Sequence, residues 1–216
     1  ERFSIGDLAG ADSAFSRAVA RDPGFAQALY QLAIARWWGG EPESANEDIR
    51  RAQENAARLS PGEREFIGAL QFLIRRDFAA ATANFQRLAA GSPEDKMILY
   101  GLEEAQFHSG QYEGTIETAR RILALDPGFT LAGRHLVDAL MRLDRVAEAQ
   151  RMAEDLLRRD PGSQLLWFSA TNTAATHVDR AALLQLQTLY QQSGSRAAVP
   201  ALALLATQGI WFSVLM

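Results

Sequence analysis

A repeat of 34 residues constrains the fold of this chain more than any other feature of its sequence. Pro93, Pro127 and Pro161 lie 34 residues apart, and Pro23 precedes Pro93 by two units of average length 35. Three of these four prolines are preceded by Asp and followed by Gly. A period of this length is typical of solenoids, in which each short unit packs against its neighbours in the chain.

Small and apolar residues repeat with nearly the same period. One series begins at Ala11, a second lies four residues after each of the first five members of that series, and a third begins at Ala18. Three series with one period indicate a structural repeat rather than a chance similarity. Their members are Ala11, Ala45, Ala81, Thr115, Ala149 and Leu183; Phe15, Ile49, Phe85, Ala119 and Ala153; and Ala18, Ala52, Leu88, Ile122, Leu156 and Tyr190.

Residues 96–127 show that each unit contains two helices. Apolar residues three and four positions apart follow one helical stripe up to Phe107, and Ser109-Gly110-Gln111 interrupts it. A second stripe runs from Thr115 to Ile122 and stops before Asp126-Pro127. Because proline disfavours helix in the residue before it and suits a first helical position, we expect each repeat proline to end one helix and open the next.

Strand-like alternation of apolar and polar residues is missing, so the sequence predicts an all-α fold. Ser60-Pro61-Gly62-Glu63 has the spacing of a capping box, with Ser60 as the cap and Glu63 reaching back.

These features resemble the tetratricopeptide repeat (TPR) family, a 34-residue helix–turn–helix with small residues where its two helices cross. Ala33 with Ala45, and Ala69 with Ala81, supply that small pair in two units. The resemblance implies a right-handed superhelical solenoid of about six antiparallel helix pairs. The order of units is also similar to TPR arrays of bacterial multidomain signalling proteins. The best-matching unit contains Leu99-Tyr100-Gly101-Leu102, Gly110-Gln111-Tyr112, Ile122 and Asp126-Pro127.

The period divides the chain into segments that we expect to form one solenoid domain. Gly6-Asp7-Leu8 matches the turn between helices, so residues 1–4 are expected to be the tail of a first helix. The predicted segments are 1–25, a partial first repeat; 26–61, 62–95, 96–129 and 130–163, four repeats; 164–195, a divergent repeat; and 196–216, a terminal helix that suits the first helix of a further repeat.

Composition excludes several classes of function. The net charge of −4 over 216 residues opposes nucleic-acid binding, and the absence of cysteine excludes disulfides and thiolate metal sites. Residues 197–216 carry no charge, but polar residues and Pro200 interrupt them, so we expect a packed helix rather than a membrane span. Trp211, Phe212 and Leu215 should then be covered by a continuation, another chain or a second copy, so the apolar C-terminal helix offers a route to self-association.

No catalytic or metal-binding motif is visible, so we predict that the chain is not an enzyme and needs no cofactor. None of His108, His135 and His177 is followed four residues later by a metal-ligating residue, and we expect them at the surface or in turns. No phosphate-binding loop or nucleophile elbow occurs. Glu103 replaces a small residue at a helix crossing, and we expect its carboxylate to reach Thr115 or solvent.

The family resemblance places first helices on the concave side of the solenoid, and spacing then gives the residues that face this groove. Many of them are aromatic or aliphatic, which suits an extended or helical apolar peptide. Packing against neighbouring units is the competing role for the same stripe. The predicted groove residues are Tyr30, Ile34, Trp37, Phe66, Leu70, Leu73, Met97, Tyr100, Glu104, Phe107, Arg134, Asp138, Met141, Phe168 and Asn172, and the stripe also includes Leu131 and Leu165.

Some family members clamp the terminal carboxylate of a chaperone with asparagine and basic residues. That clamp is not expected here, because Ile34, Leu70, Glu104 and Asp138 occupy the asparagine position.

The sequence therefore predicts a scaffold that binds a protein or peptide in its groove. The alternative is a regulatory or sensory segment that controls an attached kinase, cyclase or DNA-binding domain in a larger bacterial protein. An enzyme and an RNA-binding helical repeat are disfavoured by the missing motifs and by the net charge. We expect a cytoplasmic location in a bacterium, and the periplasm stays open because the N-terminus is expected to be incomplete.

Overall fold

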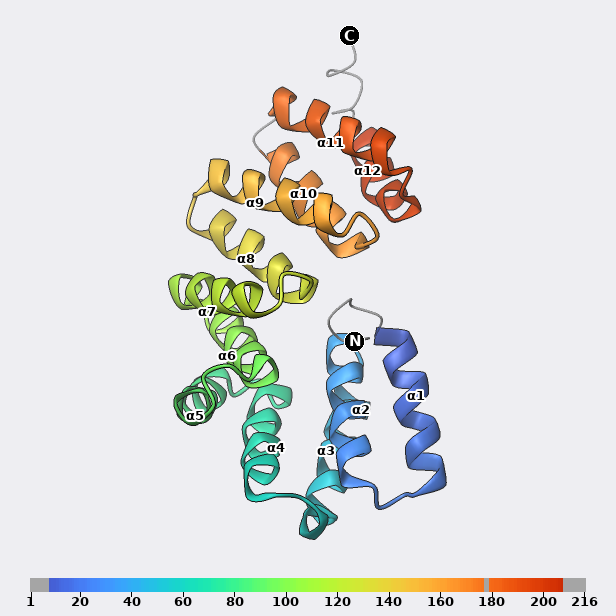
Figure 1. Cartoon of the computed structure of the whole chain (residues 1–216), viewed down its shortest axis with the longest axis vertical. Coiled ribbons are helices and arrows are strands. Elements are labelled where there is room, and N and C mark those ends of the chain that lie inside the picture. Colours follow the sequence, from blue (N-terminus) through green and yellow to red (C-terminus); the bar gives the residue numbers. More distant parts are fainter. Residues whose placement is uncertain (1–7, 177–178, 208–216) are drawn as a thin grey trace. The chain divides into compact units, whose positions relative to one another are not determined.

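The computed structural model describes residues 8–176 and 179–207 (Figure 1). Within these residues the chain consists of α-helices joined by short connections, and it contains no strand. The predicted all-α class is confirmed. The expectations for residues 1–4, His177, Trp211, Phe212 and Leu215 concern positions outside the described residues.

The helices are similar in length, and most are 13 or 14 residues long. Short 3₁₀ turns at Ala56–Arg58 and Arg196–Ala198 precede α4 and α12. The α-helices in the described residues are α1 (Leu8–Arg21), α2 (Ala26–Trp38), α3 (Pro42–Glu54), α4 (Pro61–Ile74), α5 (Phe78–Gly91), α6 (Lys96–His108), α7 (Tyr112–Leu125), α8 (Thr130–Arg142), α9 (Val146–Arg159), α10 (Gln164–Thr176), α11 (Arg180–Ser193) and α12 (Val199–Thr207).

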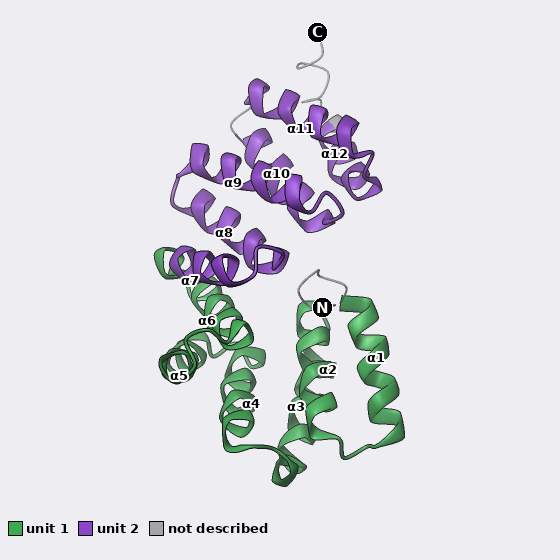
Figure 2. Cartoon of the chain, viewed as in Figure 1, with its two compact units in different colours: residues 1–114 green, residues 115–216 purple. Residues whose placement is uncertain are grey.

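The chain forms two compact units, residues 1–114 (unit 1) and residues 115–216 (unit 2), with the boundary inside α7 (Figure 2). In unit 1, α1 packs on α2, α2 on α3, α4 on α5 and α5 on α6. In unit 2, α8 packs on α9 and on α10, and α10 packs on α11 and α12. Within each unit, helices that follow one another in the chain are therefore also neighbours in space, as a helical repeat requires.

The predicted capping box is present at the start of α4. The Ser60 hydroxyl accepts a hydrogen bond from the Glu63 backbone N–H at 3.2 Å, and the Glu63 carboxylate accepts one from the Ser60 backbone N–H at 2.8 Å. Pro61 occupies the first helical turn, where its missing N–H costs no helical hydrogen bond. Hydrogen bonds between residues three positions apart therefore cap the start of this helix.

The Asp-Pro-Gly segments end one helix as predicted, but the proline does not open the next helix. At Pro127, the Asp126 carboxylate accepts a hydrogen bond from the Gly128 backbone N–H at 3.0 Å, and α8 begins only at Thr130. The other two Asp-Pro-Gly segments form the same side-chain hydrogen bond. The expected position of the proline was wrong because the aspartate stabilises a turn between the helices.

The repeated small and apolar positions form the helix packing. Ala45 and Ala81 in unit 1 are fully buried, and so are Thr115, Ala149 and Leu183 in unit 2. A side chain of one or a few carbons at such a position lets two helix backbones approach closely. The 34-residue period in the sequence thus marks the core of the structure.

One of the two environments predicted for Glu103, solvent, is wrong. The expectation allowed its carboxylate to reach solvent, but Glu103 on α6 is fully buried. Its helix carries a long run of buried residues, from Ile98 to Gln106. Solvent exposure is therefore wrong for Glu103, because α6 is buried on most of its circumference.

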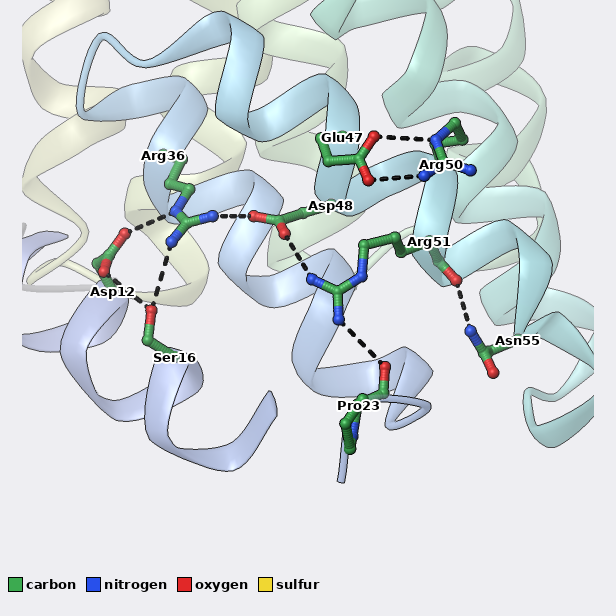
Figure 3. Close-up of polar contacts among 9 residues, drawn as sticks. All are labelled: Asp12, Ser16, Pro23, Arg36, Glu47, Asp48, Arg50, Arg51 and Asn55. Carbon is green, nitrogen blue, oxygen red and sulfur yellow. Dashed lines mark hydrogen bonds and ion pairs between the residues drawn. The ribbon is translucent and has the colours of Figure 1, made fainter. Parts of the chain in front are cut away.

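An ion-pair network joins the first three helices of unit 1 (Figure 3). Arg36 on α2 contacts Asp12 on α1 at 3.0 Å and Asp48 on α3 at 2.6 Å. Arg51 on α3 lies 3.7 Å from Asp48 and also donates a hydrogen bond to the Pro23 carbonyl at 3.3 Å. The Arg36 guanidinium thus links α1, α2 and α3, and its partner on α3, Asp48, is buried.

Candidate functional site

Unit 2 contains an open groove of about 420 Å³, which we call the unit 2 groove. Three helices line it, and the central one, α10, packs against both α8 and α12. Its volume lies within the range of pockets that bind ligands. The lining residues are Arg134 and Asp138 from α8; Leu165, Phe168, Ser169, Thr171, Asn172 and Ala175 from α10; and Ala201, Leu204 and Leu205 from α12.

Aliphatic and aromatic side chains form most of the wall of the unit 2 groove. Leu165 is 42% exposed and Leu204 is 49% exposed, although both are large apolar residues. Phe168 on α10 also lines the groove and is partly exposed. When a ligand covers these exposed leucines, the complex is stabilised by about 25 cal/mol for each Å² of apolar surface that is removed from water. The groove wall therefore favours an apolar ligand.

A polar cluster in the groove lining connects α8 to α10. Asp138 accepts hydrogen bonds at both carboxylate oxygens, from Ser169 Oγ to Oδ1 at 3.0 Å and from Arg134 Nη1 to Oδ2 at 3.2 Å. The Arg134 side chain is 28% exposed and that of Asp138 is 31% exposed, so both reach the groove surface. The cluster fixes the two side chains that carry charge in the groove lining.

The surroundings of the Asp138 carboxyl shift its pKa. Burial raises the pKa of Asp138 above its ordinary range, while the Arg134 and Arg142 cations and the Ser169 hydrogen bond act in the opposite direction. Asp138 is the only carboxylate among the described residues that line the groove, and both of its oxygens already accept hydrogen bonds. We therefore assign it no metal or general-base role, and treat it as the partner of Arg134.

Four predicted groove residues come together in the unit 2 groove: Arg134, Asp138, Phe168 and Asn172. Asn172 is exposed, and its carboxamide can donate and accept hydrogen bonds as a peptide bond requires. Met141, a fifth predicted residue of unit 2, is partly exposed on α8 and does not line the groove.

In unit 1, five predicted residues retain partial exposure on three helices. The Tyr30 and Phe66 rings meet edge to face with centroids 6.0 Å apart, and thereby join α2 to α4. The remaining three are Trp37 on α2 and Met97 and Phe107 on α6. Their role in partner contact stays a prediction.

The other five predicted residues are buried within unit 1. Ile34, Leu70, Leu73, Tyr100 and Glu104 are at most 3% exposed. The centroids of the Tyr100 and Trp38 rings are 4.6 Å apart. The Tyr100 hydroxyl donates a 2.8 Å hydrogen bond to the Glu104 carboxylate. These buried side chains pack helices together and offer little surface to a partner.

The histidine expectations hold for one residue and fail for another. His108 is exposed at the end of α6 and lies 3.5 Å from a carboxylate oxygen of Glu104. His135 is fully buried in α8, where its ring Nε2 accepts a hydrogen bond from Arg134. The surface position expected for His135 is wrong because α8 packs on both α9 and α10.

Sequence reasoning missed the contribution of α12 to the groove. Ala201, Leu204 and Leu205 belong to the uncharged C-terminal stretch, which the sequence predicts to be an apolar helix suited to open a further repeat. Their place opposite α10 depends on tertiary packing. The 34-residue period could have indicated this contribution. It makes α8, α10 and α12 the first helices of three successive repeats.

No helix of the described segments is both long enough and apolar enough to span a bilayer.

Comparison with solved structures identifies the same architecture elsewhere. YrrB, a TPR protein described as having an unusual peptide-binding site, is 19% identical with a TM-score of 0.52, over 88% of this chain and 98% of YrrB. The thermophilic TPR protein TTC0263 from Thermus thermophilus is 14% identical with a TM-score of 0.62, over 84% of this chain and 99% of its own. Pseudomonas aeruginosa pilF is 16% identical with a TM-score of 0.59, over 90% of this chain and 89% of its own. At these identities the likeness concerns the fold.

Sequence comparison leads to the same family. Two models of the tetratricopeptide repeat match residues 69–128 and residues 106–170. No curated protein sequence matches the chain at a significant level. Together with the 34-residue period and the helix pairs, these matches show that the chain is a tetratricopeptide repeat protein.

Proposed function

We propose that this protein is a binding scaffold that captures a segment of a partner protein in the unit 2 groove. The observation that carries the proposal is the groove itself, an open hollow of about 420 Å³ with exposed leucines in its wall. Water-exposed apolar side chains gathered in a concave site mark binding surfaces on soluble proteins. The peptide-binding site named for the structurally similar YrrB supports this type of function.

The groove offers the two kinds of contact that a peptide needs. Leu165, Phe168 and Leu204 can bury an apolar side chain of the partner. Asn172 can pair with a backbone amide of the partner, because its carboxamide has both a donor and an acceptor. Apolar contacts would supply most of the affinity, and the amide contact would set the direction of the bound segment. No step of this function requires catalysis.

Peptide display on the full chain tests the proposal. A library of short random peptides is selected against the wild-type protein and against the Leu165→Glu variant, which places a charge in the groove wall. Leu184→Glu is the matched control, because Leu184 is 41% exposed on α11 and does not line the groove. We expect enrichment of peptides that bind wild type and Leu184→Glu alike and lose at least about tenfold in affinity for Leu165→Glu.

Equal binding to all three proteins would show that peptides attach elsewhere, and absence of enrichment would remove peptide binding as the function. A second copy of the chain is the competing occupant of the exposed α12 surface. Sedimentation velocity over a range of protein concentrations would reveal that outcome as a dimer that Leu204→Glu dissociates.

A further inference from the structure

The charges of the unit 2 groove are balanced within the protein. The Arg134 guanidinium and the Asp138 carboxylate form an ion pair across one helical turn of α8, with 3.2 Å between Nη1 and Oδ2. Both Asp138 oxygens and two Arg134 nitrogens have partners in the protein. Arg142 also lies near Asp138, but its side chain is exposed and water screens its charge.

Because the Arg134 and Asp138 charges already neutralise each other, a charged ligand group would bind weakly in the groove. An anionic group that approached Arg134 would compete with Asp138, and a cationic group that approached Asp138 would compete with Arg134. Either group would also lose water against Leu165, Phe168 and Leu204, which cannot replace its hydration. A neutral apolar side chain carries no such penalty and buries the exposed leucines.

We propose that the unit 2 groove selects uncharged, apolar peptide segments, and that the Arg134–Asp138 ion pair is the element that excludes charged ones. This inference rests on the proposed function and specifies its ligand class. Ser169 contributes by holding Asp138 in place from α10, because its hydroxyl donates to the oxygen that Arg134 does not contact. Arg134 and Asp138 are thus specificity-determining residues rather than a source of affinity.

Changing one member of the pair should therefore change the charge preference in a defined direction. Asp138→Asn keeps the shape of the side chain and an acceptor for Ser169, but leaves the Arg134 charge uncompensated. Arg134→Met keeps the length of the side chain and leaves the Asp138 charge uncompensated. The first variant should admit acidic peptides and the second should admit basic ones. Asp155→Asn is the matched control, because Asp155 pairs with Arg159 in an exposed position on α9 outside the groove.

The experiment selects one library of random peptides against the four full-length proteins at pH 7.5 in low salt, after circular dichroism has established that each is folded. For wild type and Asp155→Asn, we expect enriched peptides to be rich in aliphatic and aromatic residues and depleted of charged ones. For Asp138→Asn we expect enrichment of Asp and Glu, and for Arg134→Met enrichment of Lys and Arg. A synthetic peptide from the wild-type selection, with its central apolar residue replaced by Glu, should gain about tenfold in affinity for Asp138→Asn relative to wild type.

The outcomes separate the two proposals. Peptides that bind in the groove with the same charge preference in wild type, Asp138→Asn and Arg134→Met would overturn the inference and leave the proposed function intact. Charged peptides enriched by wild type would overturn it as well. Lack of enrichment by any folded protein would instead overturn the proposed function, and the inference with it.

Discussion

Arg36 and Asp48 form the shortest contact of the network that joins the first three helices, with 2.6 Å between Nη1 and Oδ2. Asp48 on α3 is only 2% exposed, whereas the Arg36 side chain on α2 is 25% exposed. The arginine therefore brings its charge to a carboxylate that water hardly reaches. Since Arg36 also contacts Asp12, the pair holds α1 against the next helix hairpin.

Replacing Arg36 with Met should destabilise unit 1 by about 3 kcal/mol, because it leaves the Asp48 carboxylate buried without its nearest cation. Arg50→Met is the matched control. Arg50 also forms ion pairs on α3, but it and Glu47 are about half exposed, so the control should leave stability almost unchanged. Urea unfolding followed by circular dichroism measures both changes. Equal effects of the two substitutions would show that the buried pair has no special role.

The stability that depends on Asp48 should decrease as the pH rises. Burial raises the pKa of Asp48, although Arg36 and Arg51 oppose the shift. The folded state then binds the proton more tightly than the unfolded state, whose carboxyl pKa is about 3.9. The resulting stabilisation is complete below about pH 4 and is lost as the pH rises through the higher pKa of the folded state.

Comparison with Asp48→Asn isolates this effect from the other carboxyls, which are common to both proteins. Unfolding free energies at pH 4, 5, 6 and 7 should show wild type losing stability relative to Asp48→Asn over this interval. A difference that stays constant, or that moves in favour of wild type, would contradict the direction of the pKa shift.

Two glycines on first helices of unit 1 should respond oppositely to replacement by alanine. A Cβ atom at Gly101 would overlap the ring of Phe85, which is fully buried on α5. Gly101→Ala should therefore cost about 1–3 kcal/mol through overpacking. A Cβ at Gly68 in α4 meets no atom within 4 Å, so Gly68→Ala should stabilise the helix by up to about 1 kcal/mol. Thermal melts of the two variants should shift in opposite directions, and a shared direction would refute this packing.

Tyr100 should behave as a core residue, in contrast to its predicted place in the groove. It is 1% exposed, so Tyr100→Ala should lower the free energy of unfolding by about 3–5 kcal/mol. Trp37→Ala should cost less, because Trp37 retains partial exposure on α2. Melting temperatures of the two variants check the order. If Tyr100→Ala melts like wild type, the buried position of this ring is incorrect.

The sequence predicts the helices well because the signals that define them are local or periodic. Ser60 and Glu63 cap α4 through hydrogen bonds over three residues, and the capping box is visible in the sequence alone. Ala45 and Ala81 occupy the same position of the repeat, and both are fully buried. A strict period identifies such positions without knowledge of how units are arranged.

The sequence separates buried from exposed residues less well on the first helices. Ile34 and Trp37 are one helical turn apart on the same predicted stripe, yet Ile34 is buried and Trp37 is partly exposed. The stripe that faces a groove and the stripe that packs on the next repeat are adjacent on the helix, so a spacing of three or four residues cannot distinguish them. The hydrogen bond from Ser169 to Asp138 spans 31 residues and likewise depends on the packing of α10 against α8.

Hydrogen–deuterium exchange of the full chain, with and without a peptide from the wild-type selection, tests most directly whether the unit 2 groove is the binding site. Binding in the groove should slow exchange in α8, α10 and α12, and Leu165→Glu should abolish the slowing while Leu184→Glu preserves it. Slower exchange confined to α1–α6, or unchanged exchange in α8 and α10 at saturating peptide, would contradict a binding site in this groove.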